Sequence, residues 1–127
     1  MPISSDRPLV GIVGPCTSGK STLQRGLLEM GITARNIAQE HSFVPDMWQR
    51  ITNPQHLVFL DVSYQASFLR KQLNWSEAEY LEQHRRLAHA RRFAEYYLMT
   101  DNLSIDSVKK QVIDFLISIR VIPNNSS

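Results

Sequence analysis

Residues 14–21 carry the clearest chemical signal in the chain. They read Gly-Pro-Cys-Thr-Ser-Gly-Lys-Ser, which fits G-x-x-x-x-G-K-[ST], the Walker A pattern of a phosphate-binding loop. Glycines let such a loop turn tightly, so that successive backbone N–H groups surround phosphate oxygens. Lys20 would reach the β- and γ-phosphates, and the Ser21 hydroxyl would coordinate Mg²⁺. The pattern therefore predicts that the chain binds ATP or GTP together with Mg²⁺.

The residues on either side supply the context that this pattern requires. Residues 8–13 are almost all apolar, which predicts a parallel strand buried on both faces. After the loop, Leu23 and Leu27 recur at helical spacing and Gly31 marks an end, so we expect a helix over residues 20–30. Strand, loop and helix thus follow one another in the order that phosphate binding needs.

The rest of the chain alternates between strand and helix signals. Apolar runs predict strands, and apolar residues spaced by three and four predict helices. We expect strands at residues 32–38, 56–63 and 96–101, helices at 64–73, 76–95 and 106–119, and a loop with a short helix at 43–51. This order predicts one domain, residues 1–127, with a three-layer α/β/α fold and a parallel sheet of about four or five strands, as in P-loop NTPases.

Two carboxylates are candidates for work at the phosphates. Ligands of parallel sheets bind beyond the carboxyl ends of the strands, and Glu40 and Asp61 both lie at such an end. Asp61 closes an apolar run, as a Walker B acid does. Glu40 could instead complete the metal shell or take a proton from an acceptor hydroxyl. Either could also be an ordinary strand-end carboxylate. We expect the neighbouring His41 to be structural or exposed.

The predicted helix 76–95 is rich in arginine. A capping-box pattern at Ser76 predicts where it starts. On a straight helix, Arg85, His89 and Arg92 would lie on one face. Arg86 and Arg91 would lie on the two flanks of that face. Such a face is either simply solvated or a lid that brings a guanidinium to the phosphates. Contact with nucleic acid is a third reading, for which one helix is a weak signal.

Beyond the loop, the chain resembles the P-loop kinases that act on nucleotides and small metabolites, such as adenylate, guanylate, shikimate and gluconate kinases. Residues 57–63, followed by a helix that contains Leu69 and Arg70, are similar to the strand and helix that precede the lid in small kinases. Residues 86–91 and 97–103 are similar to the region from the lid to the last strand of guanylate kinases.

The resemblance implies roles for individual residues. Asp61 would belong to the strand before the lid, which makes Glu40 the better candidate for the metal. Arg86 would be the lid arginine, and the turn at Asn102 and Leu103 would lie near the nucleotide base. Thr22 would face the α-phosphate.

The predicted site is therefore defined by three sets of residues. The set expected to carry the chemistry is Lys20, Glu40, Asp61 and Arg86. The metal ligands are Ser21 and Glu40. The nucleotide would be bound by Gly14, Pro15, Cys16, Thr17, Ser18, Gly19, Lys20, Ser21 and Thr22. We interpret Cys16 as a variable residue that binds through its backbone N–H, because no histidine or basic residue adjoins it in the sequence.

These observations predict a kinase-like phosphotransferase that moves a γ-phosphate to a small-molecule or nucleotide acceptor. The segment 39–55 is shorter than the acceptor-binding insertion of the family, and the second lid arginine expected near Asn74 and Trp75 is absent. A non-catalytic nucleotide-binding or regulatory module is therefore the alternative. A switch GTPase is disfavoured, because the chain contains neither N-K-x-D nor D-x-x-G.

Composition places the expected function inside the cell. A single cysteine excludes an internal disulfide and suits a reducing cytoplasm. Residues 1–7 lack the apolar core of a signal peptide, and the sequence has no apolar run long enough to span a membrane. The net charge of +2 is too small to indicate nucleic acid as a partner.

Overall fold

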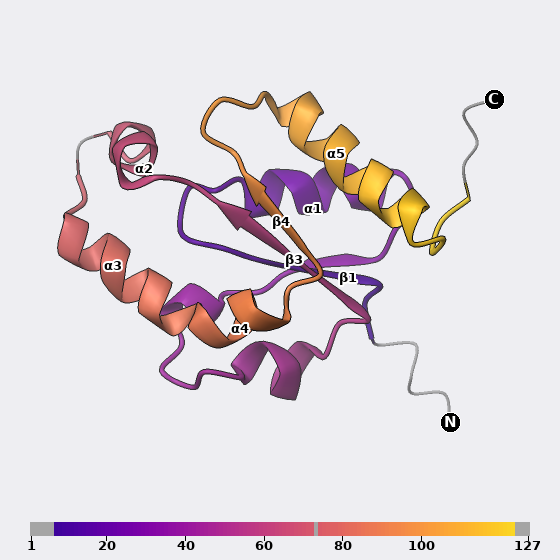
Figure 1. The fold of residues 1–127 in the computed structure, drawn as a ribbon, viewed down its shortest axis with the longest axis horizontal. Helices are drawn as coiled ribbons and strands as arrows, with labels where there is room; N and C mark the ends of the chain where they lie inside the picture. The colour runs from indigo at the N-terminus through magenta and orange to yellow at the C-terminus, as the bar shows by residue number, and fades with distance from the viewer. Residues whose placement is uncertain (1–6, 73, 124–127) are drawn as a thin grey trace.

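The computed structural model describes residues 7–72 and 74–123 and has a mixed α/β fold. A four-stranded parallel sheet crosses the molecule, with α1 and α5 on one side of it and α3 and α4 on the other (Figure 1). This arrangement is compatible with the predicted three layers. The expectation about a signal peptide falls on residues that are almost all outside the described part.

The predicted strands are all present in shorter form. They are β1 (Val10–Val13), β2 (Ala34–Asn36), β3 (His56–Asp61) and β4 (Tyr96–Met99). The helices are α1 (Lys20–Glu29), α2 (Tyr64–Arg70), α3 (Glu77–Arg86), α4 (Ala88–Phe93) and α5 (Ile105–Ser118), with a 3₁₀ turn η2 (Gln39–His41) and a π-helical turn η3 (Trp48–Thr52). In the described part of the chain, none of the helices is both long and apolar enough to cross a membrane.

The strands lie in the order β2-β1-β3-β4, and each neighbouring pair is parallel. Their carboxyl ends therefore meet at one edge, toward which the arrowheads of β3 and β4 point in Figure 1. The 14–21 loop, η2 and the start of α2 all follow directly from strands at this edge. The topology thus gathers the segments in which the sequence predicts a site.

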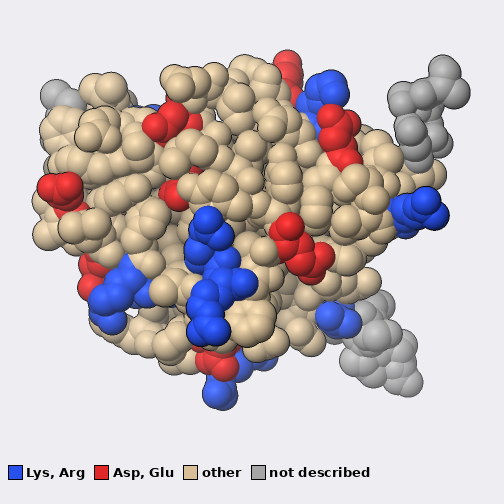
Figure 2. All heavy atoms as spheres, viewed as in Figure 1, with Lys and Arg blue, Asp and Glu red and all other residues tan. Residues whose placement is uncertain are grey.

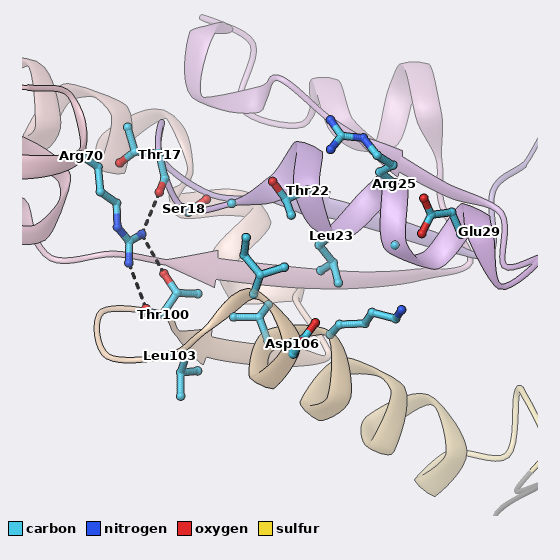
Figure 3. Close-up of a pocket in the computed structure, with 15 residues that line it drawn as sticks. Thr17, Ser18, Thr22, Leu23, Arg25, Glu29, Arg70, Thr100, Leu103 and Asp106 are labelled. Carbon is cyan, nitrogen blue, oxygen red and sulfur yellow. Dashed lines mark hydrogen bonds between the residues drawn. The ribbon is translucent and has the colours of Figure 1, made fainter.

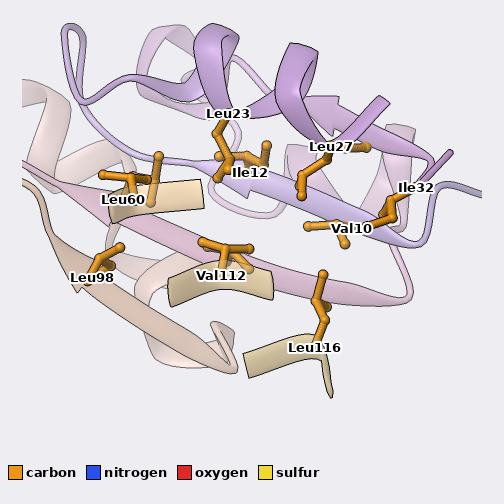
Figure 4. Packing of buried hydrophobic residues seen from close by; sticks show 12 residues of the cluster. Val10, Ile12, Leu23, Leu27, Ile32, Leu60, Leu98, Val112 and Leu116 are labelled. Carbon is orange, nitrogen blue, oxygen red and sulfur yellow. The ribbon is translucent and has the colours of Figure 1, made fainter. Parts of the chain in front are cut away.

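The larger apolar core lies between the sheet and the pair α1 and α5 (Figure 4). Leu23 and Leu27 of α1 and Val112 and Leu116 of α5 are buried against Val10 and other strand residues. These residues recur at helical spacing, which is why the sequence predicts both helices correctly. Ser104 caps α5 by accepting a hydrogen bond from the N–H of Ser107 (3.1 Å).

The second core lies on the opposite face of the sheet. Val13 and Phe59 point to this side, where Leu87, Ala90 and Trp48 cover them. The indole N–H of Trp48 donates to Nδ1 of His89 (3.0 Å), which joins η3 to α4. Segment 39–55 is therefore packed onto the domain.

The single helix predicted over residues 76–95 is wrong. The chain breaks at Leu87, which ends α3 and precedes α4. Leu87 is fully buried, and its N–H still bonds back to the carbonyl oxygen of Gln83 (3.0 Å). Leu87 and Ala90 are both buried in the core on this face of the sheet. The capping box predicted at Ser76 is confirmed.

Removal of a core side chain from α5 should test this packing. Leu116 is fully buried, so we expect Leu116→Ala to lower the free energy of unfolding by about 2–5 kcal/mol, because it leaves a cavity. Ile105→Ala is the control on the same helix, since Ile105 is 67% exposed and its truncation should cost no more than about 0.5 kcal/mol. Urea denaturation measures both values. Equal losses in the two variants would contradict the described core.

Candidate functional site

Two glycines set the backbone path of the 14–21 loop between β1 and α1. A Cβ added to Gly14 would lie 1.9 Å from the carbonyl oxygen of Leu60 in β3, so a side chain there collides with the sheet. Gly19 has a φ of 99°, a left-handed conformation that suits glycine, and α1 begins directly after it. Because Gly19 has no side chain to cap the helix, the first N–H groups of α1 remain available to an anion.

Lys20 turns its side chain back into the loop and is only 6% exposed. Its Nζ donates hydrogen bonds to the carbonyl oxygens of Gly14 (2.8 Å) and Pro15 (3.1 Å). Nζ also lies 3.0 Å from Oε2 of Glu40, which compensates its charge inside the protein. The structure thus brings together Lys20 and Glu40, both of which the sequence assigns to the site.

Glu40 is held by η2, directly beyond the short strand β2. The residue is 4% exposed. Its Oε1 is buried without a hydrogen-bond partner among the described residues, and so are the hydroxyl oxygens of Thr17 and Ser18 in the loop. Buried polar atoms of this kind cost free energy unless a ligand, ion or ordered water pairs with them. A ligand, ion or water that paired with these atoms would therefore be stabilised at the loop.

Ser21 is exposed at the other end of the loop. Its hydroxyl oxygen accepts a hydrogen bond from Nδ2 of Asn36 at the end of β2 (2.9 Å). The backbone N–H of Asn36 in turn donates to the side chain of Gln24 in α1. A hydroxyl oxygen has two lone pairs, so Asn36 can orient Ser21 and still leave it able to coordinate a cation.

Asp61 has different partners. Its Oδ2 accepts from the hydroxyl of Tyr97 (2.6 Å), its Oδ1 accepts from the N–H of Val62 (2.8 Å), and Nε2 of His84 lies 3.3 Å from Oδ1. Burial by itself would raise the pKa of the Asp61 carboxyl, but the contacts with His84, Tyr97 and Val62 outweigh it and lower the pKa below 3.8. Burial and the bond to Asp61 raise the pKa of Tyr97. The Asp61 carboxylate thus ties β3 to β4 and α3.

The arginines of α3 and α4 do not share the single face predicted for them, because the break at Leu87 separates them. Nε of Arg86 bonds to Glu82 (2.8 Å), and its guanidinium lies over the ring of Phe43 (4.2 Å). Arg91 instead covers the ring of Tyr97 (4.1 Å). Figure 2 shows basic side chains gathered in a band over α4.

Arg70, at the end of α2, contacts the 14–21 loop, and no site role was predicted for it. Its Nη1 donates to the carbonyl oxygen of Thr17 (2.8 Å), and its Nη2 donates to the carbonyl oxygen of Thr100 (3.0 Å), as the dashed lines in Figure 3 show. The sequence signals for Arg70 were its place in the helix that follows β3, at the edge where ligands bind, and the resemblance of that helix to the one before the lid in small kinases. Arg70 thereby links the loop to the residue just after β4.

Two cavities flank the loop. One, of about 480 Å³, lies on the side of α1 and the start of α5 (Figure 3). Its lining includes Thr17, Thr22, Arg70, Leu103 and Asp106. The other, of about 460 Å³, lies on the side of α3. Its lining includes Cys16, His41, Trp75, Gln83 and Arg86.

Folding gives Cys16 neighbours that its position in the sequence conceals. Its Sγ lies 3.6 Å from Nε2 of His41. Its backbone N–H donates to Oε1 of Gln83 (2.9 Å), and Nε2 of Gln83 donates to the sulfur (3.1 Å). His41 is 25 residues away along the chain and Gln83 is 67 away, so no local pattern indicates either contact.

Asparagine in place of Asp61 should reduce the acid sensitivity of the fold. The folded-state pKa of Asp61 lies below its ordinary value of 3.8. The ionised carboxylate therefore contributes stability that is fully present above the unfolded-state pKa and is lost as pH falls through the folded-state pKa.

The free energy of unfolding should accordingly fall less between about pH 6 and about pH 3 in Asp61→Asn than in the unmodified chain. Asp114→Asn is the control, since Asp114 forms an exposed ion pair with Lys110 on α5. Urea denaturation at both pH values gives the comparison. A fall in Asp61→Asn as large as in the unmodified chain would contradict the described role of Asp61.

Comparison of the chain with protein-family models gives no match, and comparison with curated proteins gives none either.

Proposed function

We propose that the chain is a P-loop domain that binds ATP or GTP with Mg²⁺ and transfers the γ-phosphate to a small-molecule or nucleotide acceptor. The observation that carries the proposal is the buried ion pair between Lys20, which belongs to a loop of Walker A sequence, and Glu40 in η2. A cation, N–H groups of a helix start and unpaired oxygens are the groups that a nucleotide phosphate and its metal use.

The nucleotide, which is the phosphate donor, would bind on the side of the loop that faces α1. The cavity of about 480 Å³ runs from the loop to Leu103, so it offers room for a nucleoside next to the phosphates. Arg70, which lines this cavity, donates hydrogen bonds to the carbonyl oxygens of Thr17 and Thr100. These bonds would keep the loop in place when a nucleotide binds. Leu103 in this lining supports a position of the 102–103 turn near the base.

The residues present also fit the predicted metal. Mg²⁺ takes oxygen ligands and keeps several waters, and the Ser21 hydroxyl and Glu40 carboxylate are oxygen donors near the loop. Glu40 Oε1 pairs with no group in the described part of the chain, so this oxygen is available as a metal ligand. When bound, Mg²⁺ would neutralise charge on the phosphates. Glu40 would hold its hydration shell, and Lys20 would leave Glu40 for the phosphates.

The acceptor would occupy the cavity of about 460 Å³ on the α3 side, whose lining includes Arg86 and Lys71 together with Glu79 and Glu82. Arg86 keeps its proposed role near the transferring group, and Asp61 is proposed to position β4 through Tyr97. The proposed family is that of the small P-loop kinases, acting in the cytoplasm without nucleic-acid or membrane partners.

A second candidate function is a nucleotide-binding or regulatory module without catalysis. The packing of segment 39–55 favours it, because Trp48 is buried against the domain where a kinase of this type would carry an acceptor-binding insertion. Both functions require that the chain binds a nucleotide, but only the phosphotransferase would consume it.

Nucleotide binding should depend on Lys20. Isothermal titration with Mg·ATP and Mg·GTP should give binding to the unmodified chain and a loss of roughly tenfold to hundredfold in affinity for Lys20→Ala, because a charge-assisted contact to phosphate is removed. Lys110→Ala, on the exposed face of α5, should bind as the unmodified chain does. No heat from either nucleotide with the folded, unmodified chain would refute the proposal.

Turnover should depend on Glu40. ATP consumption measured with a panel of hydroxyl and phosphate acceptors should fall by about 10²–10⁴ in Glu40→Gln, if the carboxylate organises the metal or accepts a proton. Glu95→Gln is the matched control, because Glu95 is exposed and pairs with His56 at the start of β3, away from the carboxyl ends of the strands. Circular dichroism checks that both variants fold. Binding without turnover on any acceptor would favour the regulatory module.

A further inference from the structure

Three side chains of the kinds that bind transition metals converge beside the 14–21 loop. Cys16 comes from the loop, and Glu40 and His41 come from η2. One possible ligand atom from each lies within 4.8 Å of the others. The sulfur of Cys16 is 3.6 Å from Nε2 of His41, and that nitrogen is 3.7 Å from Oε2 of Glu40.

These separations suit a tetrahedral zinc ion. With Zn–S near 2.3 Å and Zn–N and Zn–O near 2.1 Å, tetrahedral angles place sulfur and nitrogen roughly 3.6 Å apart and nitrogen and oxygen roughly 3.4 Å apart. The sulfur–nitrogen and nitrogen–oxygen distances differ from these by a few tenths of an ångström at most. The sulfur and the carboxylate oxygen lie within 4.8 Å of each other, so side-chain movement would bring the three ligand atoms around the ion.

The surroundings of the three ligands also point to a bound cation. Glu40 is 4% exposed, and within residues 7–72 and 74–123 its Oε1 has no hydrogen-bond partner. Gln83 is buried and forms two hydrogen bonds with Cys16: its Oε1 accepts from the backbone N–H, and its Nε2 donates to the sulfur. An N–H donated to a ligand sulfur is a common outer contact in metal sites. The side chain of His41 is 60% exposed, so it is free to turn toward the ion.

We propose that Cys16, Glu40 and His41 bind Zn²⁺, with water as the fourth ligand. Cys16 and His41 both line the cavity of about 460 Å³, from which the ion and its water would arrive. Thiolate and imidazole favour zinc over magnesium, which prefers oxygen alone. Binding releases the proton of the Cys16 thiol to solvent.

Occupation of this site would change the pairing of Lys20. Oε2 of Glu40 is 3.0 Å from Nζ of Lys20, and the same carboxylate is a ligand of the proposed zinc ion. Zinc would therefore draw Glu40 away from the lysine and from the metal shell of a nucleotide. This consequence rests on the proposed function, whereas the zinc site itself does not.

Titration of the full chain with Co²⁺ and with Zn²⁺, in a phosphine reductant and without nucleotide, tests the site. Co²⁺ bound by a thiolate gives a charge-transfer absorption in the near ultraviolet, and calorimetry gives the affinity for Zn²⁺. We expect one ion per chain and a cobalt band that Cys16→Ser abolishes. His41→Gln should weaken binding by at least about tenfold, as loss of a ligand or its support does.

His56→Gln is the control, because His56 also pairs with a glutamate, Glu95, but lies at the start of β3. It should bind both metals as the unmodified chain does. The absence of a cobalt band, or equal affinity in His41→Gln and the unmodified chain, would overturn the proposal, since a lone surface thiol would then explain any binding. Half an ion per chain would also overturn it, because two chains would share the metal.

The link to nucleotide binding has a separate readout. Saturating Zn²⁺ should weaken Mg·ATP binding to the unmodified chain more than to His41→Gln at the same total zinc. If zinc binds as described and nucleotide affinity does not change, the shared use of Glu40 is wrong. If the chain binds no nucleotide at all, the proposed function fails while the metal titrations still decide the zinc site.

Discussion

The buried ion pair between Nζ of Lys20 and Oε2 of Glu40 connects the segments that make up the candidate site. Lys20 begins α1 and Glu40 lies in η2, so the pair joins the first helix to the segment after β2. Lys20 also bonds to the carbonyl oxygens of Gly14 and Pro15, which closes the loop around its own cation. Removal of one partner from a buried pair typically costs about 3–5 kcal/mol, because the remaining charge is left without compensation. Ionic and hydrogen-bond contacts of Lys20 thus fix the path of the loop.

Two further long-range contacts hold the same loop from either side. Arg70 of α2 bonds to the carbonyl oxygen of Thr17, and Gln83 of α3 bonds to the backbone N–H of Cys16. Each partner stands on a helix, so the loop is supported by regular structure at both flanks. Such support keeps backbone N–H groups oriented before a ligand arrives, which lowers the entropic cost of binding. In the same loop, the hydroxyl oxygen of Ser18 is buried without a partner in the part of the chain that the structure describes.

The parts of the fold that could be predicted from sequence are those set by neighbouring residues. The strands, the helix that begins at Lys20, the capping box at Ser76 and the apolar stripe of α5 all follow from spacing within a few turns or one strand. The contacts of Arg70 and Gln83 with the loop join residues 53 and 67 positions apart, so no local pattern encodes them. The predicted arginine face failed for a related reason. The predicted face assumed a straight helix over residues 76–95, and the chain instead breaks at Leu87 between α3 and α4.

Lys20 and any bound metal ion would compete for the carboxylate of Glu40. One oxygen already faces Lys20, and the same group lies within reach of His41 and Cys16. A carboxylate that compensates a buried ammonium cannot also neutralise a divalent cation to the same extent, because each added positive charge in a low-dielectric site repels the others. Any cation that binds Glu40 must therefore displace Lys20 or share its charge with it. A phosphate would remove that conflict by offering Lys20 a new anionic partner. The loop thus favours a ligand that brings both a cation and negative charge, and a bare metal ion would bind at the expense of the native ion pair.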